Sequence, residues 1–196
     1  MKTLKFEEIY DQKLASDAII HDGYIGFRED YLALHCLLRK YKPKSLLEIG
    51  THRGVGVNII CNAIPKSNVY SLDLPYEKKN YSEQYPYTTI DEQKVEDGVD
   101  LIGCLATCKY TQLRGDSMTF DFSQYPCEAY WIDAEHDYDH PFHETTEVLK
   151  NDPKMIIWHD SDMEPVWKAI NDAMTNQPYE LYRVVDTRIS YALRIK

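Results

Sequence analysis

Short apolar runs alternate with longer amphipathic stretches along most of this chain. The apolar runs that we expect to form strands lie at residues 45–49, 68–72, 110–114, 128–132 and 155–158. The stretches whose apolar side chains recur at helical spacing lie at residues 30–41, 55–64, 91–108, 143–150 and 164–174. Units of strand, helix and strand place successive strands parallel to each other. The pattern therefore predicts an α/β fold.

The C-terminal residues follow a different pattern. Two runs rich in β-branched and apolar residues, at 182–185 and 189–195, are separated by a short segment at 186–188, which predicts an antiparallel hairpin. We therefore expect a Rossmann-like, mostly parallel sheet flanked by helices, with an antiparallel C-terminal strand near its edge. A polar segment bounded by prolines, at residues 75–86, predicts an exposed loop that could act as a lid.

The charge of the chain argues against polyanionic partners. Its 22 basic and 32 acidic side chains give a formal net charge of -10, which repels nucleic acid and anionic lipid surfaces. No segment approaches the roughly 18 apolar residues of a membrane span, and the five cysteines form no CxxC pair. We expect a soluble, cytoplasmic protein that binds neither nucleic acid nor membrane.

A glycine-rich turn separates the strand at 45–49 from the helix that follows it. The segment reads LLEIGTHRGVG and contains Gly50, Gly54 and Gly56. Ligands of open α/β sheets bind beyond the carboxyl ends of the strands, where glycines let the backbone approach closely. The spacing is GxxxGxG rather than the GxGxxG that rests a pyrophosphate on a helix N-terminus. The turn therefore favours S-adenosylmethionine, which carries no phosphate, over NAD.

Two acidic residues flank this turn in the predicted fold. Glu48 stands just before Gly50 and could accept hydrogen bonds from backbone amides or from a ligand's ammonium group. Asp73 follows the next strand, where an acid takes the ribose hydroxyls of NAD and S-adenosylmethionine alike. An ordinary tight turn and a capping or loop aspartate would explain each feature singly. Further acids after two later strands, on the same predicted edge of the sheet, favour a cofactor site.

Five segments together resemble the class I S-adenosylmethionine-dependent methyltransferases: LLEIGTHRGVG, VYSLDLP, LRGDS, WIDAEHDY and IIWHD. The likeness is in particular to the small bacterial group labelled methyltransferase family 24, and it covers residues 43–196. That group has a strand ending in Asp, followed by spaced His and Tyr, and later a strand ending in His-Asp; here these are Asp133, His136, Tyr138, His159 and Asp160. The chain departs from the group at Ala134, usually glycine, and at NDPK before Met155, usually a paired-glycine turn.

The resemblance implies a methyltransferase that binds S-adenosylmethionine at these strand ends. In the family pattern Glu48, Gly50 and Gly54 border the methionine part of the cofactor. The same pattern assigns the ribose to Asp73, the adenine to Asp116 with Ser117, and the sulfonium to Asp133. The residues expected to bind the cofactor are Glu48, Gly50, Thr51, Gly54, Asp73, Leu74, Asp116, Ser117 and Asp133.

Methyl transfer to a hydroxyl also requires removal of its proton, so we expect a base or a metal ion near the methyl group. Our first choice of base is His136 and our second is His159, with Asp133 as a further catalytic residue. Asp133 and Asp160, with His159 or His136 as a further ligand, could instead bind Mg²⁺ or another divalent cation. Such a cation would lower the pKa of the hydroxyl directly. The alternative for either histidine is that it serves only to hydrogen-bond the loop backbone.

The expected function is O-methylation of a small-molecule acceptor by a single methyltransferase domain at residues 1–196. A helical segment at 1–42 would cover the acceptor side, and residues 43–196 would form the cofactor-binding core. Three further histidines are expected to be loop or exposed helix residues: His52, His140 and His143. Two alternatives stay open, a non-catalytic protein that binds S-adenosylmethionine and an NAD-dependent short oxidoreductase. A homodimer, the commonest symmetric oligomer, is a further possibility.

Overall fold

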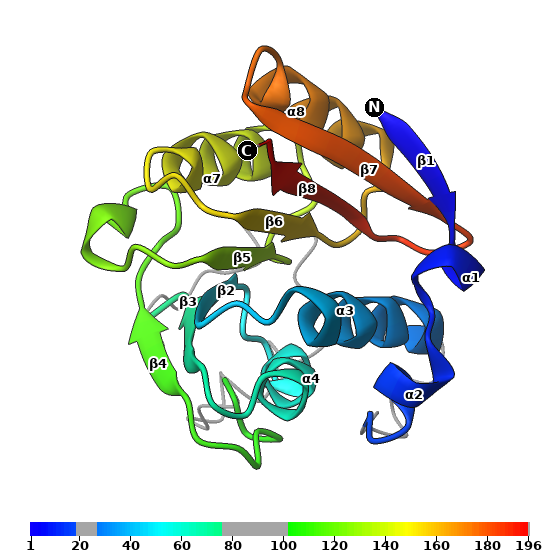
Figure 1. Cartoon of the computed structure of the whole chain (residues 1–196). Coiled ribbons are helices and arrows are strands. Elements are labelled where there is room, and N and C mark those ends of the chain that lie inside the picture. The colour runs from blue at the N-terminus through cyan, green and yellow to red at the C-terminus, as the bar shows by residue number, and fades with distance from the viewer. Residues whose placement is uncertain (19–26, 76–101, 196) are drawn as a thin grey trace.

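One eight-stranded sheet with helices on both faces forms the framework of the chain (Figure 1). This computed structural model describes residues 1–18, 27–75 and 102–195. The strands are β1 (Lys2–Lys5), β2 (Ser45–Ile49), β3 (Asn68–Asp73), β4 (Thr111–Arg114), β5 (Ala129–Ile132), β6 (Met155–Trp158), β7 (Tyr179–Val185) and β8 (Ser190–Arg194). The helices are α1 (Phe6–Ile9), α2 (Gln12–Ala15), α3 (Arg28–Tyr41), α4 (Val55–Ala63), the short 3-10 helix η2 (Phe122–Gln124), α7 (Asp139–Leu149) and α8 (Glu164–Met174).

Parallel pairing dominates the sheet, whose strand order is β1-β7-β8-β6-β5-β2-β3-β4. Among the described strands, only β8 runs against its neighbours, because it pairs antiparallel with both β6 and β7. All other pairs are parallel, including that of β1 with β7. The predicted mostly parallel sheet with an antiparallel C-terminal strand near the edge is confirmed.

The direction of strand addition reverses beside β2. The chain runs from β2 to β3 and β4 on one side and then returns to β5 and β6 on the other side of β2. Ligands of open α/β sheets bind at such a switch point, beyond the carboxyl ends of the strands. Because β2 to β6 are parallel to one another, the residues that follow them meet at this one edge of the sheet.

Helices cover the sheet on both faces (Figure 1). Each face has its own hydrophobic core. On one face Leu34 of α3 and Ile60 of α4 pack in a cluster with Trp131 of β5. On the other face Ile170 of α8 packs in a cluster with Trp158 of β6. Every residue of β5 and β6 is buried, as expected for parallel strands covered on both sides. None of the described helices is long and apolar enough to cross a membrane.

The N-terminal segment does not begin with a helix. Residues 2–5 form β1, whose residues pair in register with Tyr182 to Val185 of β7, and the short helices α1 and α2 follow before α3. Partners for this strand lie at the other end of the chain, so local spacing gave no sign of it. The expectation of a purely helical segment at 1–42 is wrong over residues 2–5.

The helix expected at 91–108 is not formed in the part that the structure describes. Residues 102–108 make turns, in which the backbone amides of Gly103 and Leu105 donate to the carbonyl oxygens of His52 and Arg53. These bonds to the turn after β2 replace the i to i−4 bonds of a helix. Residues 91–101 of that expected helix, and residues 76–86 of the expected loop, lie outside the described residues.

Candidate functional site

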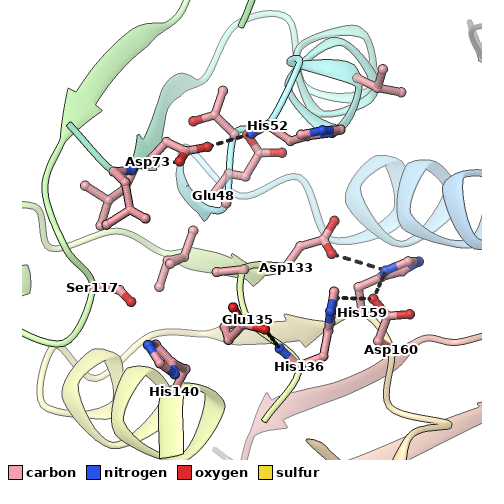
Figure 2. Close-up of a pocket in the computed structure, with 18 of the residues that line it drawn as sticks. Glu48, His52, Asp73, Ser117, Asp133, Glu135, His136, His140, His159 and Asp160 are labelled. Atoms are coloured by element: carbon pink, nitrogen blue, oxygen red, sulfur yellow. Dashed lines mark hydrogen bonds and ion pairs between the residues drawn. The ribbon is translucent and has the colours of Figure 1, made fainter. Parts of the chain in front are cut away.

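A pocket of about 470 Å³ opens at the carboxyl ends of the parallel strands. Figure 2 shows Glu48, Asp73 and Asp133, from three separate strand ends, around the same space. The pocket lining includes eight of the nine predicted cofactor residues, namely Glu48, Gly50, Thr51, Asp73, Leu74, Asp116, Ser117 and Asp133. It also includes all three remaining candidates for catalysis or metal binding, His136, His159 and Asp160.

The glycine turn brings the end of β2 against the segment that follows β5. Gly50 has φ +100°, and a Cβ there would lie 2.0 Å from the carbonyl oxygen of Asp133. Gly54 has φ +89°, and a Cβ there would lie 2.9 Å from the Cβ of Ala106. Gly54 is the one predicted cofactor residue outside the pocket lining. Both glycines therefore permit close approach between protein segments, and Gly50 thereby holds Asp133 beside the turn.

Glu48 is a buried carboxyl in the pocket wall, with 1% of its surface exposed. It accepts a hydrogen bond from Ser71 Oγ, which lies 2.6 Å from Thr51 Oγ1. Burial raises the pKa of Glu48 well above its ordinary value, and the carboxylates of Asp133 and Asp73 raise it further. A positively charged group bound here would offset the repulsion among these acids.

Two backbone amides, one in the turn after β2 and one directly after β3, orient the carboxylate of Asp73. Its Oδ2 accepts a hydrogen bond of 2.7 Å from His52 N, and its Oδ1 accepts one of 2.7 Å from Leu74 N. Burial raises the pKa of Asp73, whereas these two bonds lower it. Each carboxylate oxygen has a second lone pair, so Asp73 can still accept two hydroxyl groups. This geometry suits a ribose.

The end of the pocket far from His159 lies between the segment after β4 and the start of α7 (Figure 2). Asp116 and Ser117 come from the first of these, and Asp116 accepts a hydrogen bond of 3.0 Å from Met118 N. His140, in the first turn of α7, lines the same end. His52 lies in the turn after β2, as expected, and also lines the pocket, whereas His140, which was expected at an exposed helix start, is partly buried.

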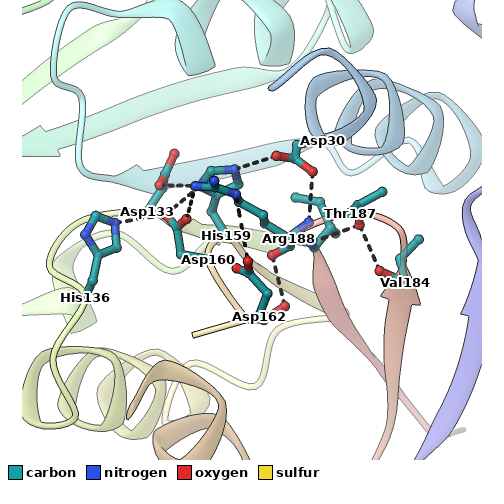
Figure 3. Close-up of polar contacts among 11 residues, drawn as sticks. Asp30, Asp133, His136, His159, Asp160, Asp162, Val184, Thr187 and Arg188 are labelled. Carbon is teal, nitrogen blue, oxygen red and sulfur yellow. Dashed lines mark hydrogen bonds and ion pairs between the residues drawn. The ribbon is translucent and has the colours of Figure 1, made fainter. Parts of the chain in front are cut away.

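His159 directly follows β6 and contacts three carboxylates (Figure 3). Its Nδ1 lies 2.8 Å from Asp160 Oδ2 and 3.2 Å from Asp133 Oδ1, and its Nε2 lies 3.2 Å from Asp30 Oδ2. Burial alone would lower the pKa of His159, but the three acids raise it well above its ordinary value. Both ring nitrogens of His159 therefore face carboxylates, an arrangement that favours the protonated imidazolium.

Asp160 joins His159 to a second histidine and to an arginine. Its Oδ2 lies 2.9 Å from His136 Nε2, and its Oδ1 accepts a hydrogen bond of 3.0 Å from Arg188 Nη1. Burial would raise the pKa of Asp160, but its contacts with the two histidines lower it well below its ordinary value. The bond to Asp160 raises the pKa of His136 in turn, which makes His136 a stronger base.

Two residues that sequence reasoning missed complete this cluster (Figure 3). Asp30, in the first turn of α3, contacts His159 and accepts a hydrogen bond of 2.9 Å from Arg188 N. Arg188, in the turn between β7 and β8, lies with its guanidinium carbon 4.7 Å from the ring centre of Phe27. Asp30 occurs where acids commonly stabilise a helix N-terminus, so the sequence contained no signal of its contact with His159.

Asp133, His159 and Asp160 also fit the predicted metal site. One ligand atom from each residue lies within 4.8 Å of the others. Two carboxylates with water suit Mg²⁺, and the imidazole would admit Mn²⁺ or Zn²⁺. The same carboxylates contact His159 Nδ1, and a nitrogen must be unprotonated to bind a metal. A divalent cation and the proton on Nδ1 would therefore compete for one place.

No protein-family model matches this chain, and no curated protein matches its sequence. Many solved structures share its fold. The O-methyltransferase TomG from Streptomyces achromogenes, in complex with SAM, is 17% identical, with a TM-score of 0.55 over 95% of this chain and 91% of that chain. The O-methyltransferase from Bacillus cereus, in complex with SAH, is 13% identical, with a TM-score of 0.54 over 96% of this chain and 100% of that chain.

MycE, a methyltransferase of the mycinamycin biosynthetic pathway solved with Mg, SAH and mycinamycin VI, is 13% identical. Its TM-score is 0.52, over 80% of this chain and 47% of that chain. The fold of this chain is therefore Rossmann-like, and it is the fold of these methyltransferases.

Proposed function

We propose that this chain is an S-adenosylmethionine-dependent enzyme that transfers a methyl group to a hydroxyl of a small molecule. The observation that carries the proposal is the convergence of Glu48, Asp73 and Asp133 on one pocket at the switch point of the sheet. Three carboxylates around a pocket favour a cationic ligand with a ribose and disfavour a diphosphate. The SAM and SAH held by TomG and by the Bacillus cereus enzyme support the same cofactor.

Each cofactor residue has a proposed partner. Bound S-adenosylmethionine supplies a methyl group already activated by a positively charged sulfur. Glu48 would accept the ammonium group, Asp73 the ribose hydroxyls, and Asp133 would face the sulfonium. Two groups of pocket residues complete this assignment: Gly50 and Thr51 beside the methionine part, and Leu74, Asp116 and Ser117 beside the nucleoside.

His136 is the proposed base. Its Nε2 contacts Asp160, so Nδ1 is the ring nitrogen left to accept the proton of the hydroxyl. His159 suits this role less, because both of its nitrogens face carboxylates. We propose instead that His159 carries a positive charge that orients Asp133 and Asp160. Mg²⁺ or another divalent cation held by Asp133 and Asp160 would supply a Lewis acid that lowers the pKa of the acceptor.

The acceptor is proposed to bind between His136 and the N-terminal segment. Phe27 and Tyr31 line the pocket beside His159, with ring centroids 6.0 and 6.5 Å from that of His159. Two aromatic rings at a polar cluster favour a small organic acceptor with an apolar body. This supports a single domain whose N-terminal segment covers the acceptor side. The homodimer stays a prediction.

Calorimetric titration with S-adenosylhomocysteine, with and without Mg²⁺, tests the cofactor and the metal together. We expect binding of S-adenosylhomocysteine and none of NAD. Absence of affinity for S-adenosylhomocysteine would refute the proposal.

A panel of phenols, sugars and aliphatic alcohols with radiolabelled S-adenosylmethionine then tests for transfer. His136→Gln should reduce turnover by about 100-fold or more without loss of S-adenosylhomocysteine binding. His143→Gln is the matched control, because His143 follows His136 on the neighbouring helix α7 and does not line the pocket. A non-catalytic protein would transfer no methyl group to any acceptor in the panel.

A further inference from the structure

Glu144 is a carboxyl that the proposed chemistry does not use. It lies in the middle of α7, with 0% of its surface exposed. Within the described residues, neither of its carboxylate oxygens has a hydrogen-bond partner. A buried polar group without a partner costs free energy, and proteins seldom leave one unexplained. We therefore expect a neighbouring polar group to become the hydrogen-bond partner of Glu144 when that group changes its orientation.

The neighbours of Glu144 are pocket residues. Glu144 lies one helical turn after His140, on the same side of α7. Burial raises the pKa of Glu144 to about 7, whereas the nearby Ser117 hydroxyl and His140 lower it. Ser117 and His140 both line the end of the pocket that is far from His159 (Figure 2). Glu144 is therefore buried close to two residues, Ser117 and His140, that line this end of the pocket.

The order of the strand ends along the pocket identifies the part of the ligand that binds at this end. Asp133 follows β5 and Asp73 follows β3, two strands away, whereas Ser117 follows β4 at the edge of the sheet. If the sulfonium faces Asp133 and the ribose binds Asp73, the purine extends toward Ser117. This step rests on the proposed function.

We propose that Glu144 is a specificity-determining residue that acts through Ser117 and selects a six-amino purine over a six-keto purine. With the ligand bound, Ser117 would turn its one hydroxyl hydrogen to the unpartnered carboxylate of Glu144, and its oxygen could then only accept a hydrogen bond from the ligand. The exocyclic amine of adenine is a donor and satisfies this oxygen. The carbonyl of hypoxanthine is an acceptor and leaves two acceptors facing each other. Glu144 is thus a positioning residue, and Ser117 makes the contact.

Glu144→Gln reverses the direction of this hydrogen bond without a change of shape. The amide N–H of glutamine can donate to Ser117 Oγ, which frees the hydroxyl hydrogen to point into the pocket. The pocket then presents a donor and loses its preference for the amine. A purely structural role for Glu144 would weaken the two purines equally, so the ratio of the two affinities separates the alternatives.

The experiment compares S-adenosylhomocysteine with its deaminated analogue, S-inosylhomocysteine, by calorimetry at about pH 8.5, where Glu144 is largely ionised. We expect the wild type to prefer the adenine ligand by about 10- to 100-fold. We expect Glu144→Gln to reduce this ratio by at least about tenfold. Ser117→Ala should reduce it as well, and Glu144→Gln in that background should change nothing further. Glu147→Gln, an exposed change on α7, should leave the ratio intact.

Two outcomes overturn the inference, and a third overturns the cofactor proposal instead. The inference fails if the wild type binds both ligands equally. It also fails if the wild type is selective but Glu144→Gln keeps that selectivity. Should Glu144→Gln not fold, Ser117→Ala decides alone, because undiminished selectivity without the hydroxyl excludes the proposed route. If the wild type binds neither ligand, the proposed function itself is wrong.

Discussion

Replacement of Glu48 by glutamine should weaken the binding of the amino-acid part of the cofactor and leave nucleoside binding intact. Glu48 is the buried carboxyl of the pocket wall, and glutamine keeps its shape and its ability to accept the bond from Ser71. The substitution removes only the negative charge. A hydrogen bond to a charged group contributes about 1.5–3 kcal/mol, so we expect the dissociation constant of S-adenosylhomocysteine to rise by about 10- to 150-fold.

A truncated ligand provides the control for this measurement. 5′-Methylthioadenosine has the purine and the ribose but no ammonium or carboxylate group, so calorimetry should give the same affinity for wild type and Glu48→Gln. Burial raises the pKa of Glu48 in the free protein, and an ammonium partner would lower it again. Binding of S-adenosylhomocysteine to the wild type should therefore strengthen as pH rises, and Glu48→Gln should lack this contribution. Equal weakening of both ligands would refute the reasoning, because Glu48 would then act only through the structure of the turn.

Three further substitutions test the backbone strain, the buried carboxyl and the histidine contacts around the site. Gly50→Ala should reduce the free energy of unfolding in urea by about 3 kcal/mol or more, because φ is +100° and the new Cβ meets the Asp133 carbonyl oxygen; a loss below about 1 kcal/mol would contradict this. In the folded chain Glu144 keeps its proton up to a pKa of about 7, whereas in the unfolded chain it releases the proton near the ordinary value of 4.5. A rise from pH 4.5 to pH 7 should therefore lower the free energy of unfolding of the wild type by about 3 kcal/mol more than that of Glu144→Gln. Urea unfolding at both pH values measures this, and a difference that does not change with pH would count against it. Asp30→Asn should lower kcat more than it weakens S-adenosylhomocysteine binding, because it releases His159 Nε2 but keeps the acceptor for Arg188 N; an effect on binding alone would argue against this role.

The parallel strands were predictable because they are buried on both faces. Runs such as AYWI at β5 and MIIW at β6 have no polar position, which is the expected signature of a strand covered by helices on both sides. The strand β1 was not predictable, because its partner β7 lies near the other end of the chain and the two strands meet only in the completed fold. Residues 102–108 were misassigned for a related reason, since their backbone bonds go to the turn after β2.

The site residues divide along the same line. Glu48, Asp73 and Asp133 were found because each stands at the end of an apolar run, and parallel strands bring such ends together. Glu144 and Arg188 were not found, because one lies within a helix and the other in a hairpin turn, where such residues are usually solvated. Only the completed fold buries Glu144 and brings Arg188 into contact with Asp30 and Asp160.

The contacts of His159 explain how one cluster could serve with or without a metal ion. Asp133 and Asp160 together need a positive charge between them, and the structure provides it through His159 Nδ1 at 3.2 and 2.8 Å. A divalent cation at the same two carboxylates would provide it as well, after loss of that proton. In both cases the positive charge lies beside Asp133, at the strand end where the acceptor is proposed to meet the methyl group. The two carboxylates, rather than the identity of the cation, therefore define where the positive charge lies, and Asp160 also holds His136, the proposed base, beside it.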